Sequence, residues 1–126
     1  MNRIATSVVT LGLLLAAAPA SASLTVTPAI KVHNQCGREI VIAVRYKDIR
    51  GGWMTTDFTN VRPRGTQDRI ASTANRVIYF YAETSPRGTR WSGSHNVLVA
   101  GKTYPMKEVR PSLDRQRNAY AIRLSC

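Results

Sequence analysis

The chain has 126 residues and a formal net charge of +11, with 18 Lys and Arg residues against 7 Asp and Glu residues. This length allows one hydrophobic core but not two, which excludes two independent domains. An excess of positive charge is typical of proteins that meet polyanions such as nucleic acids, acidic glycans or acidic proteins. A second interpretation is that the charge only keeps the protein soluble among anionic surfaces.

The N-terminus has the pattern of a secretory signal peptide, residues 1–22. Arg3 provides the positive charge, residues 8–18 are apolar, and residues 20–22 give the small-x-small cleavage pattern. The apolar run is shorter than the roughly 20 residues that cross a bilayer, so we expect cleavage and not a membrane span. Cleavage leaves residues 23–126 as a single domain, and the loss of Arg3 lowers the net charge from +11 to +10. The sequence therefore predicts a periplasmic or secreted protein.

Two cysteines, Cys36 and Cys126, remain after cleavage. In an oxidising compartment an isolated pair predicts one disulfide, which here joins the start of the domain to its last residue. No C-x-x-C pair is present, so neither redox chemistry nor a thiolate metal site is predicted. We expect the bond to join the first and last strands.

Alternating apolar residues and turn signals divide the mature chain into short strands without a helix. Residues 39–46 are an example, because Ile40, Ile42, Val44 and Tyr46 share one face. Residues 84–95 form the longest loop, and residues 110–117 form a polar connection with room for one helical turn. The predicted strands are residues 30–34, 39–46, 53–58, 67–72, 76–83, 96–100, 103–108 and 118–125.

The strand at residues 76–83 is expected to be central. Its two alternate faces are both apolar: one carries Tyr79 and Tyr81, and the other carries Ile78 and Phe80. A strand of this kind needs cover on both sides, which places it in the middle of a layered fold. Seven or eight short strands at this spacing predict an all-β protein, an antiparallel sandwich.

Several short motifs follow one another along the chain. They are Asn34-x-Cys36, Ile40-x-Ile42-Ala43-Val44-x-Tyr46, Gly52-Trp53, Pro63-x-Gly65, Tyr79-x-Tyr81-Ala82-Glu83 and Trp91-x-Gly93. This order resembles the bacterial domain of unknown function ten-thirty-six. The resemblance implies a small exported β domain and covers about residues 32–93, but the family has no established activity. The chain departs from the family pattern after Trp53, where another aromatic residue is usual, and it has two cysteines where the family tends to carry more.

The sequence contains few residues suited to catalysis. The two histidines, His33 and His95, have no metal-ligand spacing, and no cofactor motif is present. An envelope-polymer hydrolase that uses Glu83 and His95 is the enzymatic alternative. We favour the interpretation that the seven acids are ion-pair partners of the many basic groups. The chain is therefore predicted not to be an enzyme.

Basic residues gather around an aromatic residue in the long loop and again near the C-terminus. Arginine forks bind carboxylates and phosphates, and an adjacent aromatic ring offers a stacking surface. We expect a binding role toward an anionic glycan, lipopolysaccharide or an acidic protein, with no specific nucleic-acid motif. A small structural or regulatory subunit is a further alternative. The candidate binding residues are Arg87, Arg90, Trp91, Arg110, Arg115 and Arg117.

Overall fold

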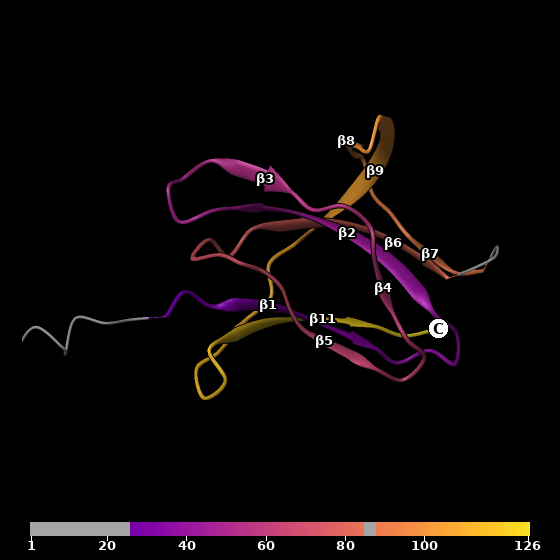
Figure 1. Ribbon diagram of the computed structural model, residues 1–126, viewed down its shortest axis with the longest axis horizontal. Helices are drawn as coiled ribbons and strands as arrows, with labels where there is room; N and C mark the ends of the chain where they lie inside the picture. Colours follow the sequence, from indigo (N-terminus) through magenta and orange to yellow (C-terminus); the bar gives the residue numbers. More distant parts are fainter. Residues whose placement is uncertain (1–25, 85–87) are drawn as a thin grey trace, which may run out of the picture.

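The computed structural model describes residues 26–84 and 88–126 and shows two β-sheets packed face to face (Figure 1). The predicted signal peptide, residues 1–22, and Arg87 lie outside the described residues. Within the described ranges the chain forms strands and turns and no helix, so the all-β prediction is confirmed. The described part of the chain includes no helix that is long and apolar enough to cross a membrane.

The smaller sheet has four strands in the order β10, β11, β1, β5. These strands are β10 (Leu113–Asp114), β11 (Ala119–Leu124), β1 (Ala29–Asn34) and β5 (Thr66–Ser72). β1 and β11, the first and last strands, are parallel neighbours, whereas the other pairs in the described sheets are antiparallel. The prediction of an antiparallel sandwich therefore holds except at this pair.

The larger sheet has seven strands built around β2 and β6. Its main path runs β3, β2, β6, β9, β8, while β4 pairs with β2 and β7 pairs with β6. The strands are β2 (Ile40–Lys47), β3 (Trp53–Thr55), β4 (Thr59–Val61), β6 (Ile78–Thr84), β7 (Arg90–Trp91), β8 (His95–Val99) and β9 (Lys102–Val109).

The parallel register of β1 and β11 explains the disulfide. Asn34 lies opposite Leu124, and each of these residues precedes a cysteine by two positions. The segments that follow β1 and β11 therefore leave the sheet side by side, and Cys36 and Cys126 are bonded with their Cα atoms 5.2 Å apart. The predicted bond between the first and last strands is confirmed, and it fixes the C-terminal end of β11.

β6 is covered on both faces, as its sequence predicts. Ile78, Phe80 and Ala82 belong to the main core between the sheets. Tyr81 points the other way and is buried in a second core under the β8–β9 hairpin, with Met106 at its centre. In Figure 1 this hairpin rises from the larger sheet on the side away from β1 and β11. The domain therefore has a third, partial layer.

Three predicted segments differ from the observed elements. Residues 53–58 are predicted to form one strand, but the observed strand β3 ends at Thr55, and the next strand that pairs with β2 begins at Thr59. The connection at residues 110–117 contains the short strand β10 in place of a helical turn. The long loop at residues 84–95 contains β7, because the register with β6 pairs Trp91 with Ala82.

Candidate anion-binding groove

A groove of about 560 Å³ lies where the two sheets separate at one side of the sandwich. One wall is the outer edge of β11, residues 121–125. The other wall comes from β6, β7 and β9, with Phe80 and Trp91 on it. Three cationic residues line the same groove: Lys107, Arg110 and Arg123. The groove thus combines an aromatic floor with a basic rim, hereafter the basic groove.

β7 places Trp91 in the basic groove and Arg90 outside it. Trp91 lies opposite Ala82, whose side chain belongs to the main core, and the indole packs partly buried against that core. Arg90 lies opposite Glu83. Since neighbouring residues of a strand point to opposite faces, Arg90 projects to the outer face. Of these two predicted binding residues, the structure brings only Trp91 into the groove.

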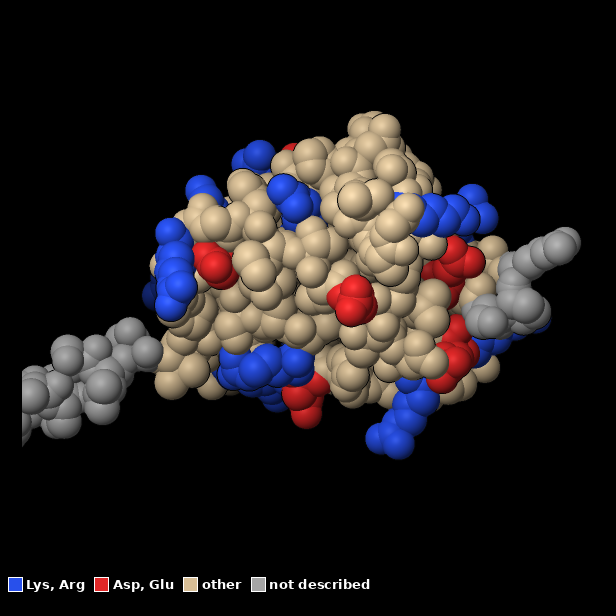
Figure 2. Space-filling view, turned by 45° about the horizontal axis from the view of Figure 1, so that its top comes forward, with Lys and Arg blue, Asp and Glu red and all other residues tan. Residues whose placement is uncertain are grey.

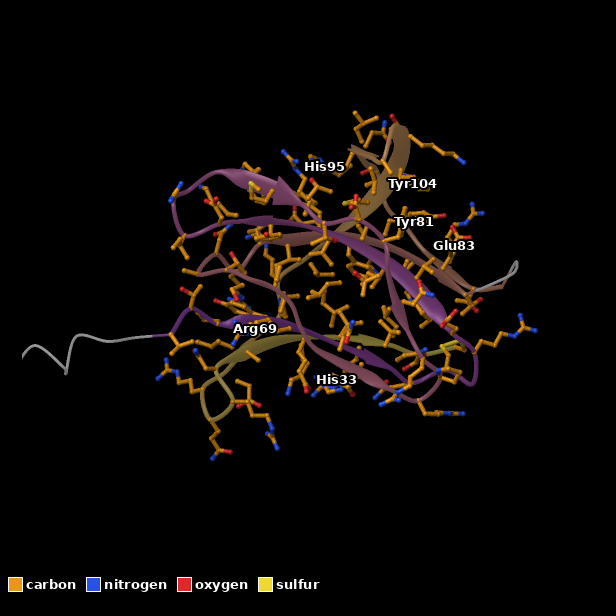
Figure 3. The ribbon with its side chains drawn as sticks, in the orientation of Figure 1. His33, Arg69, Tyr81, Glu83, His95 and Tyr104 are labelled. Atoms are coloured by element: carbon orange, nitrogen blue, oxygen red, sulfur yellow. A yellow bond between two sulfur atoms is a disulfide. The ribbon has the colours of Figure 1, made fainter. Side chains whose placement is uncertain are left out.

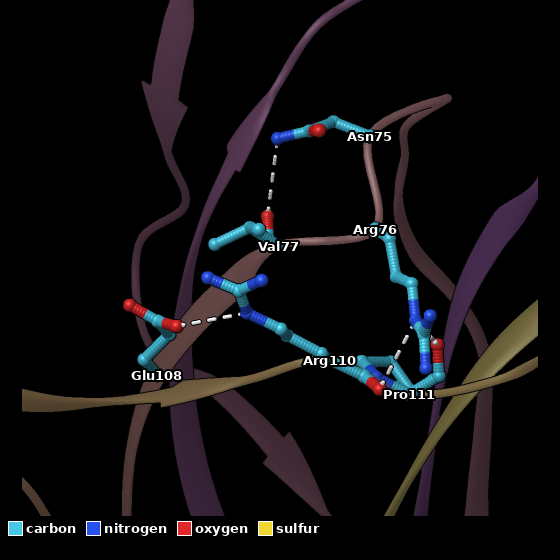
Figure 4. A network of polar contacts seen from close by, with 6 residues as sticks. All are labelled: Asn75, Arg76, Val77, Glu108, Arg110 and Pro111. Atoms are coloured by element: carbon cyan, nitrogen blue, oxygen red, sulfur yellow. Dashed lines mark hydrogen bonds and ion pairs between the residues drawn. The ribbon is translucent and has the colours of Figure 1, made fainter.

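A network of polar contacts holds Arg110 at the mouth of the groove (Figure 4). Its Nε donates to Glu108 Oε2 at 3.1 Å. The Arg76 Nε atom lies 3.4 Å from the carbonyl oxygen of Arg110 and 3.2 Å from that of Pro111, and donates to both. Arg76 therefore fixes the backbone of the connection that crosses from one sheet to the other. The Arg110 side chain is 64% exposed, so its guanidinium remains accessible to a ligand.

Lys107 and Arg123 complete the groove and are absent from the predicted binding set. Lys107 lies opposite Phe80 in the β6–β9 register, so it shares the core-facing side of the sheet at the open edge. Arg123 lies on β11 opposite His33 of β1. Alternation within β9 indicates which residues share a face, but only the register with β6 shows that this face borders a groove.

A second, smaller hollow of about 260 Å³ lies on the outer face of the smaller sheet. Ala119 and Ala121 line it with small side chains, and Arg123 belongs to both hollows. The hollow is lined by Lys31, His33, Asp114, Arg117, Ala119, Ala121 and Arg123 and is hereafter the His33 pocket. The predicted binding residue Arg117 lies here, whereas Arg115 is exposed in the turn before β11 and lines neither hollow.

Burial and neighbouring cations shape the electrostatics of the His33 pocket. His33 Nδ1 lies 3.1 Å from Thr66 Oγ1. Desolvation lowers the pKa of His33 below its usual 6.5, and the charges of Arg123 and Lys31 lower it further. Asp114 accepts hydrogen bonds from the backbone N–H and the guanidinium of Arg117, and these contacts lower the pKa of that carboxyl group. The Asp114 carboxylate thus already accepts hydrogen bonds from the Arg117 side chain and from backbone N–H groups of the turn that follows it.

Among the described residues, most of the positively charged side chains have no acidic partner. Residues 26–84 and 88–126 contain three ion pairs, which join Lys31 to Asp68, Arg110 to Glu108 and Arg117 to Asp114. Figure 2 shows Lys and Arg side chains at several separate places on one face, without one continuous patch. The basic groove and the His33 pocket are therefore the hollows that several cationic residues line together.

The structure does not bring Glu83 and His95 together. His95 stacks on Tyr79 with ring centroids 4.1 Å apart, and Tyr79 precedes Glu83 by four residues along β6. At about 3.3 Å per residue, this separates the two positions by roughly 13 Å. Glu83 instead accepts a hydrogen bond from the Tyr81 hydroxyl at 2.7 Å; burial, followed by this bond, raises the pKa of Tyr81 to about 12. Figure 3 shows Glu83 near Tyr81.

Comparison with known proteins assigns no function to these sites. Among the described residues, no group of three or more His, Cys, Asp and Glu side chains is placed to hold a metal ion. No protein-family model, curated protein or solved structure matches the chain. The geometry of the two hollows is therefore the basis for assigning a role.

Proposed function

We propose that this protein is a periplasmic or secreted, non-catalytic binding domain that engages an anionic partner through the basic groove. One observation carries the proposal: Lys107, Arg110 and Arg123, from three different segments, line the same groove as Trp91. Cations that surround an aromatic surface bind carboxylates, sulfates or phosphates while apolar parts of the ligand cover the ring. The family resemblance stays a prediction and adds no activity to this proposal.

The disulfide supports the predicted compartment. A buried Cys36 sulfur, bonded to the C-terminal residue, is compatible with an extracellular or otherwise oxidising environment. Glycans, lipopolysaccharide and acidic proteins all present anionic groups in such environments. A domain with a net charge of +10 after signal-peptide removal is attracted to each of them, so a test must separate the groove from the overall charge.

Retention on immobilised heparin tests the proposal. A triple variant of the groove, Lys107→Gln, Arg110→Gln and Arg123→Gln, is compared with a charge-matched control, Arg50→Gln, Arg62→Gln and Lys102→Gln. Both triples lose one Lys and two Arg, so they share any loss of nonspecific attraction. We expect the groove triple to bind about ten-fold more weakly than the control at physiological salt, from three contacts of about 0.5 kcal/mol each. Equal loss of retention in the two triples contradicts a binding role for the groove.

A further inference from the structure

One long edge of β11 has no partner strand over most of its length. On one side β11 pairs with β1 along its whole length, from Ala119 to Leu124. On the other side β10 pairs only with Ala119 and Tyr120. No other described strand lies against this side, so residues 121–125 form an open edge that also lines the basic groove.

The hydrogen-bonding groups of this edge can be assigned from the bonds to β1. The carbonyl of Leu124 accepts from the N–H of Gln35 at 2.8 Å, and the carbonyl of Asn118 accepts from the N–H of Ala29 at 3.0 Å. The N–H and C=O of one strand residue point to the same side, and the side alternates along the strand. The residues whose backbone groups point away from β1 are therefore Ala121, Arg123 and Ser125, which face the groove.

The chain itself keeps the edge open. β10 runs antiparallel to β11, so the residues before Leu113 are next in line to pair with the edge. Arg76 instead binds the carbonyls of Arg110 and Pro111 at the crossing between the sheets. The chain therefore leaves the smaller sheet at this point. At the other end, the Cys36–Cys126 bond fixes the last residue after the edge.

We propose that residues 121–125, the end of β11 and the residue after it, bind an acidic, extended peptide segment of a partner protein by β-strand addition. The peptide continues the line of β10, pairs its backbone with the open edge, and directs alternate side chains onto Phe80 and Trp91. Its acidic side chains, on the other face of the peptide, meet Arg123, which lies opposite His33 on the outer face of the smaller sheet. This inference rests on the proposed function, because it uses the same groove, and it names the class of partner.

Charge complementarity selects this occupant over a second copy of the chain. Two β11 edges paired with each other bring the Arg123 side chains of both copies to one short interface, where like charges repel. An acidic segment replaces this repulsion with attraction. It also needs little reorganisation of the protein, because β1 and the disulfide already hold β11 in an extended conformation.

The experiment measures binding of two synthetic peptides to the disulfide-bonded protein. The probe is a fluorescent six-residue peptide of alternating Glu and Val. Two control peptides have the same sequence with N-methyl groups on alternate amides, one on the odd-numbered and the other on the even-numbered residues. N-methylation keeps the charge of the peptide but removes the hydrogen bonds that the methylated amides donate. We expect saturable binding of the first peptide and about ten-fold weaker binding of the methylated peptide whose N-methyl groups point toward β11. We also expect slower hydrogen exchange at the amides of Ala121, Arg123 and Ser125.

The outcomes separate this inference from the proposed function. Equal binding of methylated and unmethylated peptides, or heparin retention without peptide binding, overturns strand addition and leaves the proposed function in place. Concentration-dependent dimerisation that protects the same three amides without peptide assigns the edge to a second copy and also overturns the inference. If the native protein binds neither heparin nor the peptide, the proposed function and the strand-addition inference are both overturned.

Discussion

The pKa of His33 is shifted by burial and by the charged side chains around it in the smaller sheet. The groups that face it are Lys31 on its own strand, Asp68 on β5, Arg123 on β11 and Arg117 in the turn before β11. Asp114 of β10 also lines the pocket, where it is bonded to Arg117. Burial and the three cations outweigh Asp68, so the neutral imidazole is favoured in the folded protein.

The lowered pKa of His33 predicts a loss of stability on acidification. The unfolded chain takes up a proton at His33 near pH 6.5, whereas the folded protein takes it up only at lower pH. Between these two pKa values the unfolded state binds more protons, so the free energy of unfolding falls as the pH decreases through this window. We expect His33→Gln to reduce the decrease in Tm on going from pH 7.5 to 5.5.

A direct titration provides the control for this prediction. The ring protons of His33, followed by NMR, are expected to titrate below pH 6.5 in the native protein. Arg123→Gln removes the cation with the largest charge effect on His33, so it should raise that pKa. A His33 pKa at or above 6.5, or no response to Arg123→Gln, contradicts the assigned electrostatics.

At the level of single residues, the sequence indicates the kind of chemistry at the site better than it indicates which residues line the site. Arg110 and Trp91 were predicted binding residues, and the structure places both in the basic groove. Arg90 was predicted with them, but the strand alternation of β7 turns it away. Lys107 was missed because its place beside Phe80 depends on the register between β6 and β9, which has no local sequence signal.

At the level of elements, strands with strong periodicity are predictable and short ones are not. β2 and β6 follow from their alternating apolar residues, and both faces of β6 are buried as expected. β7 and β10 have only two residues each, so pairing with a neighbour and not composition decides their conformation. The break between β3 and β4 is similarly absent from the sequence pattern, since Thr56 N–H bonds to Val44 and its hydroxyl accepts from the Val44 N–H.

The β8–β9 hairpin is held by its buried residues, among them Met106, and not by its exposed Leu98. Met106 is fully buried in the second core, whereas Leu98 on the same hairpin is 66% exposed. Removing a buried side chain leaves a cavity, so we expect Met106→Ala to lower the free energy of unfolding by about 2–5 kcal/mol. The matched variant Leu98→Ala should change it by less than about 0.5 kcal/mol. Urea unfolding measures both, and similar midpoints for the two variants contradict the assignment of the hairpin core.

At the level of the whole molecule, the disulfide and the sheet order depend on each other. The sequence predicts the bond from cysteine count alone, but the parallel pairing of β1 and β11 that makes it feasible has no sequence signature. Ninety positions separate Cys36 from Cys126, and the bond encloses every strand except β1. It therefore restricts the unfolded chain over nearly the whole domain and anchors the edge that lines the basic groove.

This long loop predicts a large effect of reduction on stability. Closing a loop of 90 residues removes chain entropy from the unfolded state that corresponds to about 4–5 kcal/mol, a large part of the roughly 5–15 kcal/mol typical of folded domains. We expect the urea midpoint of the native protein to fall sharply when reductant is added. The double variant Cys36→Ala, Cys126→Ala should have a low midpoint that reductant does not change. If the reduced and oxidised proteins unfold at the same urea concentration, the β1–β11 pairing alone holds the C-terminal strand in place.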